Sequence, residues 1–205
     1  KGIYNVDVYN QILNGEIPEN TVLSHDLLEG NLLRCGLLTD VVLLDGFPLR
    51  YIPYVLRNHR WNRGDWQIIK WLKSDKLNLI SKFKIFDNLR RSLVPIFAFV
   101  ILLICSIGNI KNVGAMNLCI AISLLSLVIS FVLDIINYVV FKESVITGTE
   151  YAYKKFSKEL NLPLTGIIRI VLTIMFLPYE MYMNLDSMIR SLYRMKSRTK
   201  LLEWM

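Results

Sequence analysis

The chain has 205 residues, of which 53% are hydrophobic, and its formal net charge is +7. Charged residues are unevenly distributed: residues 93–141 hold one basic and one acidic residue, whereas residues 1–92 hold 13 basic and 10 acidic residues and residues 142–205 hold 10 and 6. This distribution excludes a plain soluble globule, a disordered chain and a coiled coil. It predicts a mainly α membrane protein with a polar arm on each side of an apolar block.

The first arm, residues 1–92, is predicted to alternate short helices with extended segments. Ser24 is suited to cap a helix that continues to Arg34, because a serine side chain can accept a hydrogen bond from the first turn. Thr39–Asp45 is an apolar run closed by turn residues, which is typical of a short buried strand. Pro53–Leu72 has a helical pattern that is dense in arginine and tryptophan.

The apolar block, residues 93–141, contains two segments long enough to cross a bilayer. Leu93–Ile110 has 18 residues and Ala115–Leu133 has 19, close to the roughly 20 that a spanning helix needs. The linker Ile110–Gly114 is too short for anything except a tight turn. The block is therefore predicted to be a transmembrane hairpin.

The orientation of this hairpin follows from its flanks. Lysine and arginine gather on both outer sides, whereas the turn carries only Lys111. The flanking residues are Lys76, Lys82, Lys84, Arg90 and Arg91 before the block and Lys142, Lys154, Lys155 and Lys158 after it. The positive-inside rule then places both arms in the cytoplasm and the turn outside.

The last part, residues 142–205, is predicted to be a cytoplasmic or interfacial helical connector. Leu164–Leu177 is a 14-residue apolar run that contains Arg169 and ends at Pro178, which favours an interfacial or buried helix over a span. Apolar residues then recur at helical spacing up to Met195, beside a basic side. This pattern indicates an amphipathic helix on the anionic inner leaflet, or a helix packed on a neighbouring domain.

The arginine and tryptophan helix carries groups that suit a sugar nucleotide. Arg57, Arg60 and Arg63 lie three apart, roughly on one helical face. Guanidinium groups form paired hydrogen bonds with phosphate oxygens, so this cluster suits a diphosphate. Trp61 and Trp66 add flat apolar faces that can stack on sugar rings.

Asp26 is a candidate general base, with His25 beside it and Glu29 one turn further on. A base, a phosphate-binding arginine cluster and a sugar platform are the parts needed for glycosyl transfer from a nucleotide sugar. The simpler alternatives are that the helix anchors the chain at the membrane interface and that Asp26 only caps its own helix.

The order of these motifs resembles that of known enzymes. Arg57-x-x-Arg60-Trp61 resembles the Q/R-x-x-R-W motif of processive family 2-type glycosyltransferases, and His25-Asp26 resembles their T-E-D motif. More specifically, five segments resemble the cyclic β-1,2-glucan synthase family (glycosyltransferase family 84). They are SHDLLEG (24–30), HRWNRGDWQ (59–67), FDNLRRSLVP (86–95), FLPYE (176–180) and LLEW (201–204).

The resemblance implies roles for single residues. Asp26 would deprotonate the acceptor hydroxyl, which attacks the anomeric carbon of glucose with inversion. Arg60 would hold the donor diphosphate, and Trp61 would stack on the acceptor end. Arg57 stands where glutamine is usual, and His25 replaces the acidic residue of T-E-D.

The resemblance also implies a setting for the chain. Residues 1–92 would be the acceptor-side, C-terminal part of a GT-A-like α/β domain that uses UDP-glucose and a glucan acceptor. No D-x-D motif occurs in the chain, so the ligands of the expected Mg²⁺ or Mn²⁺ would lie in an upstream donor-binding half. A phosphorylase-like region would follow downstream, and the fragment alone would be inactive.

Two alternatives stay open beside this interpretation. One is another processive polysaccharide synthase with a different sugar or linkage, and the other is a non-catalytic membrane anchor or interaction protein. Nucleic-acid binding is not expected, because membrane flanks account for the positive charge and no nucleic-acid motif occurs. The three cysteines lack the spacing of a metal site.

Overall fold

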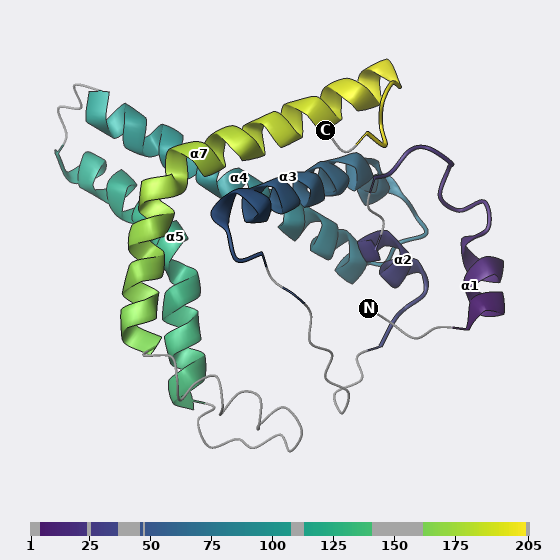
Figure 1. Ribbon diagram of the computed structural model, residues 1–205, viewed down its shortest axis with the longest axis horizontal. Coiled ribbons are helices and arrows are strands. Elements are labelled where there is room, and N and C mark those ends of the chain that lie inside the picture. Colours follow the sequence, from purple (N-terminus) through teal and green to yellow (C-terminus); the bar gives the residue numbers. More distant parts are fainter. Residues whose placement is uncertain are drawn as a thin grey trace. The chain divides into compact units, whose positions relative to one another are not determined.

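The computed structural model describes residues 5–23, 26–36, 46, 48–107, 113–140 and 162–203, and helices dominate these ranges (Figure 1). The helices are α1 (Val6–Leu13), α2 (Asp26–Leu32), α3 (Tyr51–Gln67), the 3₁₀ helix η1 (Ile68–Lys73), α4 (Leu79–Ile107), α5 (Val113–Val140) and α7 (Leu162–Ser197). The described ranges contain no strand, so the mainly α prediction is confirmed for them. The predicted strand Thr39–Asp45 lies outside the described residues, and the GT-A-like α/β domain stays a prediction.

The first two helices are short and polar at their starts. Asn5 caps α1, because its side-chain oxygen accepts hydrogen bonds from the backbone N–H groups of Asp7 at 2.9 Å and Val8 at 3.2 Å. Gly15 follows the helix at a φ of 75°, a conformation that glycine adopts without strain. The predicted cap Ser24 lies outside the described residues, and α2 ends two residues before the predicted Arg34.

The arginine and tryptophan segment is helical, as its pattern predicts. Pro53 lies in the first turn of α3, where its missing N–H removes no hydrogen bond. After Gln67 the chain tightens into η1, which ends before Ser74. The predicted single helix is thus an α-helix followed by a 3₁₀ segment.

The chain divides into two compact units. The first contains Lys1–Leu37, Asp45–Leu93 and Tyr182–Met205, and the second contains Val94–Met181. The hydrophobic core of the first unit joins α2, the end of α3, η1 and the first half of α4; its buried members are Val22, Leu28, Trp66, Ile68, Leu77, Ile85 and Leu89. The C-terminal part of α7 contributes Met188 to the margin of this core.

Two described helices are long and apolar enough to cross a membrane: Leu79–Ile107, which is α4, and Gly166–Ser197 within α7. The first contains most of the predicted span Leu93–Ile110. The second predicted span, Ala115–Leu133, lies within α5, whose described apolar stretch, Val113–Leu125, is shorter. The hairpin arrangement stays a prediction.

The prediction that a helix ends at Pro178 is wrong. α7 is one helix of 36 residues, and Pro178 lies inside it. Proline costs a helix one backbone hydrogen bond and a steric clash, but the apolar and amphipathic patterns on its two sides continue the helix. The 14-residue run Leu164–Leu177 therefore belongs to a longer helix, which is why α7 reaches the length of a span.

Candidate functional site

Asp26 is the first residue of α2, and its side chain is exposed. Leu28, two residues later, is fully buried in the core with Trp66 and Ile68, so packing holds the short helix in place. Leu28 of α2 and Trp66 at the C-terminal end of α3 belong to the same hydrophobic core. The arrangement leaves the Asp26 carboxylate accessible on an anchored turn; the neighbouring His25 lies outside the described residues.

Glu29 lies one turn after Asp26 and lines a pocket of about 310 Å³ in the first unit. The pocket walls come from α1, the following loop and the C-terminal segment; they are formed by Tyr9, Leu13, Ile17, Pro18, Glu19, Asn20, Thr21, Val22, Glu29 and Leu202. The pocket borders the hydrophobic core, because Val22 belongs to both.

Arg57 and Trp61 form a pair on α3. The Arg57 guanidinium carbon lies 4.7 Å from the centroid of the Trp61 ring, within the range of a cation–π interaction. The Trp61 side chain is 47% exposed, and Arg60 is half-buried. This part of α3 thus presents a cation and an aromatic ring together at the surface.

Arg63 does not share that surface. It is fully buried, and its Nη2 donates a hydrogen bond to the backbone oxygen of Glu203 at 2.5 Å. Burial lowers the pKa of Arg63, and the nearby Arg194 and Arg190 lower it further. Residues three apart on a helix drift by about 60° at each step, so Arg63 has turned roughly 120° away from Arg57.

Trp66 is also a core residue rather than an exposed platform. Its side chain is 8% exposed, and its indole Nε1 donates to the hydroxyl of Ser92 on α4 at 3.1 Å. One residue earlier, Asp65 accepts a hydrogen bond from Asn88 of α4 at 2.9 Å. Burial raises the pKa of Asp65, against the lowering effect of this bond. Together these contacts tie α3 to α4.

The predicted site residues are thus divided: Arg57, Arg60 and Trp61 lie in the middle of α3, whereas Trp66 lies at its C-terminal end and Asp26 lies on α2. The α2 helix packs near Trp66, whereas Arg57 lies nine residues earlier in the helix, about 13 Å along its axis. No recorded contact joins Asp26 to Arg57 or Trp61 among the described residues.

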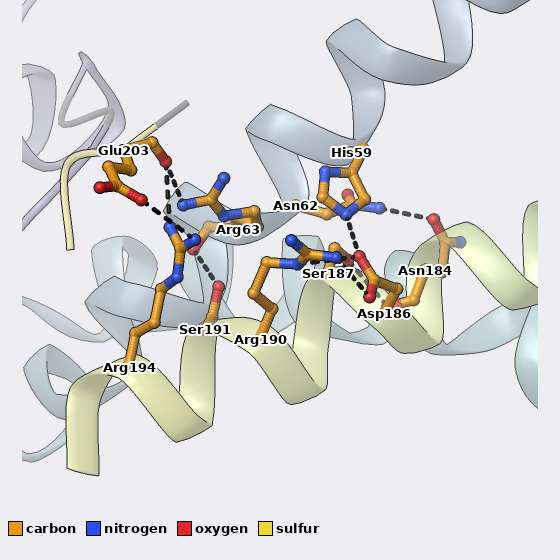
Figure 2. Close-up of polar contacts among 10 residues, drawn as sticks. All are labelled: His59, Asn62, Arg63, Asn184, Asp186, Ser187, Arg190, Ser191, Arg194 and Glu203. Carbon is orange, nitrogen blue, oxygen red and sulfur yellow. Dashed lines mark hydrogen bonds and ion pairs between the residues drawn. The ribbon is translucent and has the colours of Figure 1, made fainter. Parts of the chain in front are cut away.

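Figure 2 shows a polar network that the sequence reasoning missed. The imidazole Nε2 of His59 on α3 lies 2.8 Å from an Asp186 carboxylate oxygen on α7, and Asn62 donates to Asn184 at 2.7 Å. Arg190 donates two hydrogen bonds to Asp186 from the next turn. These contacts pin the second half of α7 onto α3.

The sequence of α7 contains a pattern of small and polar residues that favours this packing. Asn184, Ser187 and Ser191 recur at spacings of three and four, which place them on one helix face. Ser187 and Ser191 are buried, and the Ser191 hydroxyl donates to the backbone oxygen of Arg63 at 3.1 Å. The helix thus packs on α3 of this chain, and both its packing on a neighbouring domain outside the chain and its placement on a lipid surface stay predictions.

Burial lowers the pKa of His59 below 6.5, while the hydrogen bond to Asp186 opposes the shift. The unfolded chain therefore takes up a proton before the folded protein does, so this contribution to stability is complete above pH 6.5 and is lost as the pH falls below it. We expect the thermal midpoint to drop between pH 7.5 and 5.5, and to drop less in His59→Asn. Equal drops in both proteins would contradict this assignment.

The described residues contain no group of three or more histidine, cysteine, aspartate or glutamate side chains that could hold a metal ion. Asp26 and Glu29 alone do not provide a ligand set.

No family model matches the sequence. A curated relative, the cyclic beta-(1,2)-glucan synthase NdvB of Rhizobium meliloti (strain 1021), is 34% identical over 209 aligned positions. The alignment covers 100% of this chain and 7% of that relative, so the chain spans a small part of the relative's length.

Proposed function

Because the chain belongs to the cyclic β-1,2-glucan synthase family, we propose that it is part of a membrane-bound inverting glucosyltransferase. The enzyme transfers glucose from UDP-glucose to a growing β-1,2-glucan. The observation that carries this proposal is the 34% identity to the glucan synthase, which extends along the whole chain. It is combined with an accessible carboxylate on α2 and an accessible arginine and tryptophan pair on α3.

In the proposed step, the Asp26 carboxylate takes the proton of an acceptor hydroxyl. The acceptor oxygen then forms a bond to the anomeric carbon of glucose while the bond from that carbon to the UDP oxygen breaks, so the configuration inverts. The exposure of Asp26 supports this role, because a base must reach its proton within hydrogen-bond distance. Leu28 in the core fixes the turn that carries it.

The proposed substrate contacts come from the face of α3 that carries Arg57, Arg60 and Trp61. Arg60, with Arg57, holds the diphosphate that leaves with uridine, because guanidinium groups neutralise its developing charge. Trp61 stacks on the acceptor sugar, and Arg57 beside it restricts the orientation of the ring. Arg63 and Trp66 instead support this surface from within the core.

The rest of the proposed enzyme lies outside this chain. A GT-A-like α/β domain completed by an upstream donor-binding half would bring uridine-binding residues and the ligands of Mg²⁺ or Mn²⁺, which would supply charge neutralisation at the diphosphate. A phosphorylase-like region would follow downstream. α4 and the neighbouring apolar helices would hold the site at the inner membrane, with both ends of the chain in the cytoplasm.

The donor assignment is tested in membranes that contain the full-length protein carrying this chain. We expect glucose from UDP-glucose to enter polymer and no comparable incorporation from UDP-N-acetylglucosamine, UDP-galactose or GDP-mannose. Preferential incorporation of another sugar would favour a different processive polysaccharide synthase and contradict the donor assignment.

Trp61→Ala is expected to lower turnover of UDP-glucose roughly tenfold, because the loss of an apolar stacking contact worth about 1.5 kcal/mol corresponds to that factor. The KM for UDP-glucose should change less than about threefold, since the ring contacts the acceptor rather than the donor. Trp61→Tyr keeps a flat ring and should retain most of the turnover. Equal losses in both variants would contradict the stacking role.

A further inference from the structure

Gln67 is the last residue of α3, six residues after Trp61, and its side chain is 4% exposed. A buried primary amide has to satisfy both its oxygen and its nitrogen, because each polar group without a partner costs free energy. The partners of this amide come from two segments that are distant from α3 in the sequence.

The amide bridges these two segments. Its Oε1 accepts a hydrogen bond from the backbone N–H of Leu23 at 2.6 Å, and its Nε2 donates to the backbone oxygen of Leu201 at 2.9 Å. The donor and acceptor types of these partners fix the orientation of the amide, because a backbone N–H can only donate and a carbonyl can only accept.

One of these bonds lies close to the proposed base. Leu23 precedes Asp26 by three residues, and the core residues Val22 and Leu28 lie on the two sides of this stretch. Leu28 fixes the helix after Asp26 by packing, which is not directional. The hydrogen bond between Leu23 and Gln67 is directional, and it fixes the backbone of Leu23, three residues before Asp26.

The other bond leads to the C-terminal segment. Two further side chains hold this segment: Arg63 donates to the backbone oxygen of Glu203, and Arg194 donates to the backbone oxygens of Lys200 and Glu203 at 2.9 and 3.1 Å. The C-terminal segment is therefore held in place where the Gln67 Nε2 atom donates to it.

We propose that Gln67 is a positioning residue for the glucosyl transfer. Its side-chain amide braces the backbone of Leu23 against the C-terminal segment. Because Leu23 precedes Asp26 by three residues, this brace sets the place of Asp26 relative to α3. The inference rests on the proposed function, because it assigns Asp26 as the group that is positioned. Gln67 itself touches no substrate in this account.

The test uses the full-length enzyme in membranes with UDP-glucose as the probe. Gln67→Met keeps the length of the side chain but removes both hydrogen bonds, and it should lower kcat per folded protein by about 10- to 100-fold, since small displacements of a reacting group have effects of this size. The KM for UDP-glucose should stay within about threefold, because Arg57 and Arg60 are unchanged. Gln11→Met, at an exposed position of α1, is the matched control and should behave as the wild type.

Gln67→Glu separates the two bonds. The carboxylate still accepts from Leu23 but cannot donate to Leu201, so the brace against the C-terminal segment is lost and kcat should fall about as far as in Gln67→Met. Protein in the membrane is quantified by resistance to protease, and kcat is expressed per resistant molecule. If Gln67→Met does not accumulate, Gln67→Asn replaces it, because the shorter amide cannot reach both partners.

Each outcome decides the proposal. Wild-type kcat per folded molecule in Gln67→Met or in Gln67→Glu would overturn it and leave Gln67 with a role in stability alone. Loss of activity in Asp26→Asn together with wild-type behaviour of Gln67→Met would overturn only this inference. Full activity in Asp26→Asn would overturn the proposed function itself.

Discussion

Asp26→Asn in the full-length protein is expected to lower kcat by about 10²–10⁴-fold, which is the usual contribution of a general base. Asparagine has nearly the same shape and can still accept a hydrogen bond at the start of α2, but it cannot take the acceptor proton. The KM for UDP-glucose should change little, because the carboxylate acts on the acceptor. The measurement is the initial rate of glucose incorporation per molecule of folded protein.

Asp7→Asn is the matched control for this change. Asp7 also lies exposed in the first turn of a short helix, so the same substitution there alters charge and helix-end electrostatics without touching the proposed site. Its activity should equal that of the wild type. Full activity in Asp26→Asn would instead support the alternative of a membrane anchor without catalysis.

Leu28→Ala is expected to destabilise the first unit by about 2–5 kcal/mol, the range for truncation of a buried leucine. Leu28 is fully buried among Trp66, Ile68 and Ile85, and no other residue of the short α2 helix is classed as buried. The loss should appear as a lower denaturant concentration for half-cleavage in pulse proteolysis of the full-length protein.

Leu49→Ala is the control, because the Leu49 side chain is fully exposed at 100%. Its half-cleavage concentration should match the wild type. A Leu28→Ala protein as resistant as the wild type would show that α2 is held by contacts other than this core, and would weaken the account of how Asp26 is positioned.

The sequence predicted best where a local pattern decides the structure. The helical spacing around Arg57 and Trp61 predicted α3, whose cation–π pair lies within one turn. The apolar run after Leu93 predicted the distal half of α4. In both cases the relevant contacts are between residues close in the sequence, so their periodicity is sufficient evidence.

The sequence predicted least where contacts join distant residues. The bonds of His59 to Asp186 and of Gln67 to Leu201 join residues that are 127 and 134 positions apart, and no local pattern specifies such pairs. Arg63 was grouped with Arg57 by spacing alone, and its burial depends on where the C-terminal segment packs. Local propensity disfavours proline inside a helix and so predicts an end at Pro178, whereas α7 continues through this residue.

Linkage analysis of the polymer made from UDP-glucose by the full-length protein tests the central claim most directly. Proton-coupled anomeric signals should show β-configured glucose, as an inverting transfer from an α-linked donor requires. Methylation products should show that the glucose units are joined through 1,2 linkages. A polymer without 1,2 linkages, or one with α-configured glucose, would contradict the account.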